Sequence, residues 1–117
     1  MDDFFAGLDF SNLDEQGKEF VDLIKEGGSH SLSVIKSQSK PIAESAERTI
    51  SIGNTAIVQL VAGKLDMEGA KQIFRRGVEQ LEDLARAEGN LIVSNSVSFL
   101  KKLGETAIGF VPKLFGM

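Results

Sequence analysis

Apolar residues recur at intervals of three and four along most of this chain, a spacing that gathers them on one side of an α-helix. The clearest stretch follows Asp66, which can cap a helix, with Glu68 in the first turn. Its apolar positions are Met67, Ala70, Ile73, Phe74, Gly77, Val78, Leu81, Leu84 and Ala85. The pattern predicts a helix over 66–88 that ends at Gly89 and Asn90, since both residues suit a left-handed cap.

A second helix is predicted over residues 41–63. Proline is tolerated in the first turn of a helix, and it disfavours helical angles in the residue before it, so Pro41 indicates a helix start. The residues that share the apolar side are Ile42, Ala46, Ile50, Gly53, Ala56, Ile57, Leu60 and Val61. Because few residues separate this helix from the next, we expect the two to form an antiparallel helical hairpin.

The first helix is expected over residues 12–26. Ser11 followed three residues later by Asp14 resembles a capping box, and the pair Gly27 and Gly28 is typical of a helix end. Beyond them Ser29, Ser31 and Ser33 alternate with His30, Leu32 and Val34. A strand here would have no partner, so residues 29–40 are interpreted as a serine-rich linker or a short helical turn.

The last helix is predicted over residues 91–111, with Pro112 as its end and residues 112–117 as an apolar extension. Residues 1–10 form an apolar and acidic N-terminal arm. The predicted fold is therefore all-α and bundle-like, a single helical domain over 1–117 with three or four amphipathic helices and a central antiparallel helical hairpin.

Charge is unevenly distributed along the chain, whose net charge is -4. Acidic residues dominate positions 1–27, and lysines outnumber acids over 90–117. Nucleic-acid binding is not expected, because it needs a clustered basic surface. The acidic first residues do not resemble a signal peptide, and no stretch is long and apolar enough to span a bilayer. The default location is therefore the cytoplasm or the interior of an assembly.

The residues needed for common catalytic and metal sites are missing from the sequence. It has no cysteine, and the single histidine, His30, lies in the predicted linker. The acidic residues keep to the polar sides of the predicted helices, and no phosphate-binding or zinc-protease motif occurs. We therefore expect no enzymatic activity, no cofactor, no metal site and no small-molecule substrate.

Both ends of the chain are unusually apolar, which predicts contacts with another body. The candidate interaction residues are Phe4, Phe5, Leu8 and Phe10 at one end and Phe110, Leu114, Phe115, Lys101, Lys102 and Lys113 at the other. Gly53 and Gly77 fall on apolar helix sides, where a missing side chain allows close helix packing, either inside the monomer or between copies.

These features predict a non-enzymatic structural or adaptor subunit that acts through helix packing, in a homo-oligomer or a larger macromolecular assembly. Its expected partners are itself or other protein subunits. The alternative is a peripheral membrane-binding protein that uses residues 90–117 as an amphipathic helix on a membrane surface. Only a few lysines are available to attract anionic lipid, and no tryptophan is present to anchor the helix.

Overall fold

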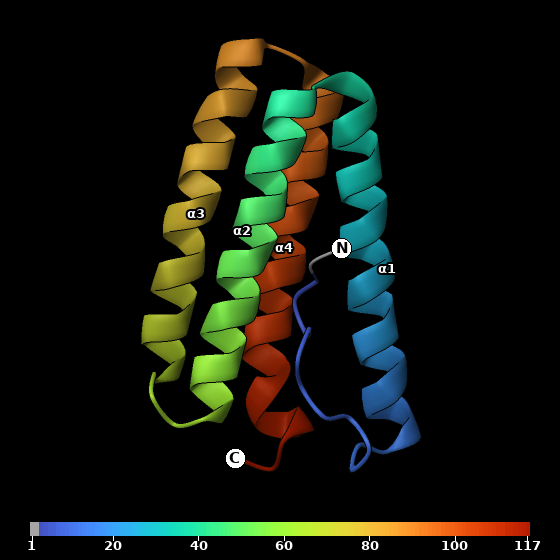
Figure 1. Ribbon diagram of the computed structural model, residues 1–117, viewed down its shortest axis with the longest axis vertical. Helices are drawn as coiled ribbons and strands as arrows, with labels where there is room; N and C mark the ends of the chain where they lie inside the picture. The colour runs from blue at the N-terminus through green and yellow to red at the C-terminus, as the bar shows by residue number, and fades with distance from the viewer. Residues whose placement is uncertain (1–2) are drawn as a thin grey trace.

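The computed structural model describes residues 3–117, and these residues form four helices packed as an all-α bundle. The helices run alternately up and down along the long axis of the molecule, and short turns join them (Figure 1). They are α1 (Glu15–Gln38), α2 (Lys40–Val61), α3 (Met67–Glu88) and α4 (Leu91–Leu114). The predicted all-α bundle is confirmed, and α2 and α3 form the expected antiparallel hairpin.

Each helix begins at a residue whose side chain accepts a hydrogen bond from the first turn. At α1, Oδ1 of Asp14 accepts from the backbone N–H of Gly17 at 2.7 Å, so Asp14 caps this helix in place of Ser11. The remaining caps are Ser39, Asp66 and Asn90. At the other end of α3, Gly89 adopts φ 71°, so the predicted left-handed end is confirmed.

The predicted linker over residues 29–40 is wrong, because α1 continues through both glycines to Gln38. Ser31, Leu32 and Ile35 are buried on the same side of the helix as the residues before Gly28. A glycine inside a helix costs about 1 kcal/mol. Close packing offsets that cost here, since a Cβ at Gly27 would lie 2.8 Å from a methyl carbon of Leu103 in α4.

The predicted end of the last helix at Pro112 is also wrong, because α4 includes Pro112 and ends at Leu114. A proline inside a helix removes one backbone hydrogen bond. The following turn is nevertheless formed, because the backbone N–H of Phe115 donates to the carbonyl of Val111 at 3.0 Å. Only Phe115, Gly116 and Met117 remain of the predicted extension.

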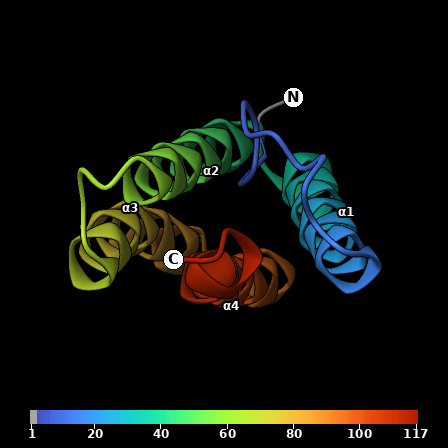
Figure 2. The ribbon, with the colours of Figure 1, turned by 90° about the horizontal axis from the view of Figure 1, so that it is seen from below.

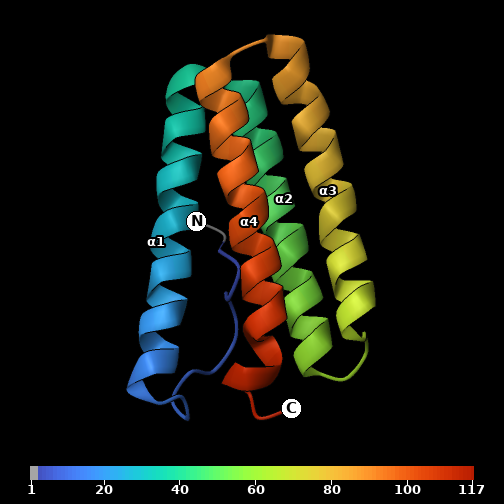
Figure 3. The ribbon, with the colours of Figure 1, turned by 180° about the vertical axis from the view of Figure 1, so that it is seen from behind.

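Helix α4 lies between α1 and α3 and packs against α2 behind it, as the view from behind shows (Figure 3). Seven of its residues are buried against these neighbours. Helices α1 and α2 separate away from the turn that joins them, and there the N-terminal segment runs between them (Figures 1 and 2). This placement makes the segment before α1 part of the bundle.

The N-terminal segment supplies two of the largest buried side chains of the core. Phe4 is 1% exposed and Phe5 is 0% exposed. The Phe4 ring meets the ring of Phe74 in α3 edge to face, with centroids 5.6 Å apart. It also fills the space beside Gly53 of α2, where a Cβ would lie 2.8 Å from the ring. Met1 and Asp2 of the predicted arm lie outside the described residues.

Candidate interaction surface

Burial removes the first two candidate interaction residues from the surface. Phe4 and Phe5 are core residues, so the prediction that they contact another body is wrong. Leu8 and Phe10 are half-buried and pack against the same core. The Phe10 ring lies edge to face with the Phe5 ring at 5.9 Å, and the ammonium of Lys25 lies 5.1 Å above it. The apolar arm therefore stabilises its own subunit.

The two ends of the chain meet inside one subunit. Phe115 lies 6.3 Å from Phe10, ring centroid to ring centroid, and Leu114 approaches Gly17 at the start of α1. A surface groove of about 680 Å³ lies at this junction. Asp14 is one of the two carboxylates that line this groove, and its Oδ1 atom accepts the hydrogen bond that caps α1. The aromatic ends that could have docked between subunits thus cover each other within the monomer.

Phe110 differs from the other terminal aromatic residues because much of its ring faces solvent. It stacks on Phe20 of α1 with centroids 4.5 Å apart and planes inclined by 27°, yet it is 41% exposed. The ammonium of Lys113 lies 5.5 Å from the centre of the same ring. Phe110 therefore remains a candidate for contact with another molecule.

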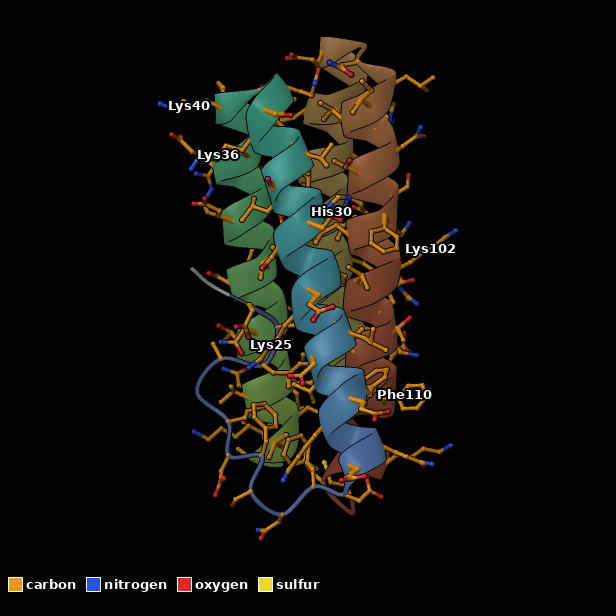
Figure 4. All side chains as sticks on the ribbon, turned by 90° about the vertical axis from the view of Figure 1, so that its right-hand side faces the viewer. Lys25, His30, Lys36, Lys40, Lys102 and Phe110 are labelled. Carbon is orange, nitrogen blue, oxygen red and sulfur yellow. The ribbon has the colours of Figure 1, made fainter. Side chains whose placement is uncertain are left out.

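The three candidate lysines of α4 separate onto two sides of the helix. Lys101 faces α3, where its Nζ lies 3.9 Å from a carboxylate oxygen of Glu82. Lys102 and Lys113 are exposed on the outer side of the bundle. Figure 4 shows Lys102 and Phe110 projecting from α4 away from the core. Lys102 and Lys113 are thus exposed lysines of α4, and Lys113 contacts the Phe110 ring.

Both candidate packing glycines lie at close approaches within the monomer. Gly53 faces the Phe4 and Phe74 rings. Gly77 faces α2, where a Cβ would lie 3.3 Å from the Cδ1 atom of Ile52, and Thr49 Oγ1 lies 3.4 Å from the Gly77 carbonyl oxygen. Of the two interpretations left open by the sequence, these contacts match packing inside one subunit.

A row of exposed apolar side chains follows the outer contact between α1 and α4. We call it the outer seam. Its exposed members are Leu23 (65%), Ile92 (53%), Phe99 (47%) and Phe110 (41%), and Phe20 and Leu103 lie half-buried between them. Gly27 faces Phe99 and Leu103, which places Leu23, one turn earlier, on the same seam.

Charges of opposite sign flank the outer seam. On α1, Glu19 and Glu26 are exposed on either side of Leu23, one helical turn from it. On α4, Lys102 and Lys113 are exposed. Lys25 and Lys36 of α1 point to the side of the helix away from α4 (Figure 4). The seam is therefore acidic along α1 and basic along α4.

Polar chemistry on the described residues is sparse. Within residues 3–117, His, Asp and Glu side chains form no group of three that could hold a metal ion. His30 is exposed on α1, next to the outer seam. A hydrogen bond donated by the backbone N–H of Ser11 lowers the pKa of the exposed Asp9 carboxyl. Ser31 Oγ is buried without a hydrogen-bond partner among the described protein atoms.

None of the helices in the described part of the chain combines the length and the hydropathy needed to cross a bilayer. Comparison of the chain with protein-family models, with curated proteins and with solved structures finds no match. The arrangement of its own residues is thus the basis for any functional conclusion.

Proposed function

We propose that this protein is a non-enzymatic structural or adaptor subunit that acts through helix packing, in a homo-oligomer or a larger assembly. The outer seam is the observation that carries the proposal. Single exposed apolar residues are common on protein surfaces, whereas contiguous apolar patches are typical of contact sites. Here four large apolar side chains, each at least 41% exposed, lie along two adjacent helices.

The composition of the seam supports a protein partner. Phenylalanine and leucine side chains supply contact area, and rings such as Phe99 and Phe110 are the type of residue that is enriched at interface centres. The residues at the chain ends contribute to the partner contact only indirectly. Phe10 packs on Phe115, and Leu114 packs on Gly17, which helps to hold α1 beside α4. The interaction residues are therefore proposed to be those of the seam, with Lys102 and Lys113 at its border.

The second candidate is a peripheral membrane protein that contacts lipid through residues 90–117. Lys102 and Lys113 beside Phe99 and Phe110 favour it, since this combination suits the interface of an anionic bilayer. Seven residues of α4 are buried in the bundle, so only its outer side is free to touch lipid without unfolding. Flotation with anionic vesicles tests this candidate, and comigration that disappears in Lys102→Glu would favour it.

Photo-crosslinking in the cells that make the protein tests the main proposal. A photoreactive phenylalanine analogue replaces Phe99 on the seam, and the matched control carries it at Lys36, an exposed position of α1 away from α4. We expect a covalent protein adduct from position 99, of the chain with itself or with another subunit, and none from position 36. An analogue at position 99 that links to no protein would contradict the proposed function.

A further inference from the structure

Two rows of side chains border the outer seam, and they carry opposite charges. On α1 the row is Glu19, Leu23, Glu26 and His30, spaced by four, three and four residues. On α4 the row is Phe99, Lys102, Thr106 and Lys113, spaced by three, four and seven residues. Such spacings align side chains along one line of a helix. All eight residues are exposed.

The contacts between α1 and α4 set the relative heights of these charges. Gly27 faces Phe99 and Leu103, so Glu26 lies at the level of Lys102. Phe20 stacks on Phe110, so Glu19 lies within about 3 Å of the level of Lys113, at about 1.5 Å of rise per residue. Glu26 and Glu19 therefore each have a lysine of α4 at nearly the same height.

This arrangement is self-complementary under one particular symmetry. A two-fold axis that runs along the seam, parallel to the helices, places α1 of one copy over α4 of another at the same height. Glu26 then meets Lys102 of the second copy, and Glu19 meets Lys113 of the second copy, each pair occurring twice. A two-fold axis perpendicular to the helices would instead oppose acids to acids and lysines to lysines.

The size of the seam fits a stable contact. Both helices have 24 residues, a length of about 36 Å at about 1.5 Å per residue. Two helices side by side are about 20 Å wide, so their full outer side presents roughly 700 Å² on each copy. Stable interfaces cover about 800 Å² per partner. The exposed rings of Phe99 and Phe110 would supply apolar area inside this contact.

We propose that the outer seam binds the outer seam of a second copy of this chain, with the two-fold axis parallel to α1 and α4. The inference rests on the proposed function and names the partner within it. A lipid surface fits less well, because Glu19 and Glu26 would repel anionic headgroups at the place where Lys102 and Lys113 attract them. A second copy satisfies both signs of charge.

Charge reversal on the full chain tests this pairing by sedimentation velocity over a concentration series at low salt. Lys102→Glu places two acids against each other at both symmetric sites, and Glu26→Lys places two lysines there. We expect each variant alone to raise the dimer Kd at least tenfold. Mixing the two variants should restore dimers, because every contact between Lys102→Glu and Glu26→Lys joins opposite charges.

Lys36→Glu is the matched control, since it makes the same charge change on the far side of α1 and should leave the Kd unchanged. A monomeric wild-type protein at millimolar concentration would overturn the pairing, and so would a dimer that both charge reversals leave intact. Variants that weaken association without recovering on mixing would overturn it as well. The proposed function has a separate test, the photo-crosslinking experiment. It is contradicted when the analogue at position 99 links to no protein, whatever the result of the charge reversals.

Discussion

Replacing Phe4 by alanine removes a ring that lies against both α1 and α2. The ring is 1% exposed and lies against Gly28, Gly53 and Phe74. Deleting a buried phenylalanine side chain costs about 3–5 kcal/mol, and the cost is highest where neighbours cannot move into the cavity. The Gly53 backbone lies on a helix held by α3, so we expect a loss near the upper end.

Urea unfolding followed by circular dichroism measures this loss. With a urea dependence of about 1.5–2 kcal/mol per molar for a domain of this size, the midpoint should fall by about 2.5–3 M. The matched control is Phe110→Ala, because Phe110 is 41% exposed and its removal should cost only about 1–2 kcal/mol. If Phe4→Ala were no more destabilising than Phe110→Ala, the N-terminal segment would not be part of the core.

Three further predictions concern single positions. Gly104→Ala should destabilise the fold by about 1–2 kcal/mol, because the added Cβ would overlap the Phe74 ring. Gly109→Ala in the same helix meets open space and should stabilise the fold by about 1 kcal/mol. Thermal unfolding of the two variants measures both effects. Ser31→Ala should raise the free energy of unfolding by about 1 kcal/mol, since it removes a buried hydroxyl without a partner, and a lower value in urea titration would contradict this. An NMR titration should find the pKa of Asp9 below the usual aspartate range. The ionised Asp9 carboxylate therefore stabilises the fold slightly at pH values above its unfolded-state pKa, and this effect disappears as the pH falls through its folded-state pKa.

The hairpin of α2 and α3 was predictable because its stop and start residues act locally. Pro41 lies in the first turn of one helix, Asp66 caps the next, and Gly89 ends it, each through its own backbone preference or one short hydrogen bond. The apolar spacing between these points then fixes which side is buried. None of these features depends on distant parts of the chain.

The continuation of α1 past Gly28 depends on distant residues and was therefore missed. Local preference favours a helix end at two glycines, but Leu103 lies where a side chain on Gly27 would be, and the close contact with α4 holds the helix together. The same reason applies to Phe4. Its burial requires the space between α1 and α2, which no local pattern in residues 1–10 describes.

The outer seam was missed because periodicity gives the direction of an apolar side but not how much of it a neighbour covers. Phe99 and Phe110 belong to the apolar side of α4 in the sequence pattern. In the bundle α1 covers only part of that side, so both rings remain nearly half exposed. The spacing of the apolar residues in α4 predicts one apolar side of that helix. The packing of α1 against α4 decides which of those residues face solvent.

The segment before α1 is made on the ribosome earlier than the core residues that it packs against. Phe4 and Phe5 are made before all four helices, whereas Phe74, against which Phe4 rests, belongs to the third helix. At about 5–20 residues per second, the two rings wait for seconds without their binding place. The core of this protein can therefore close around these rings only after α3 has been made.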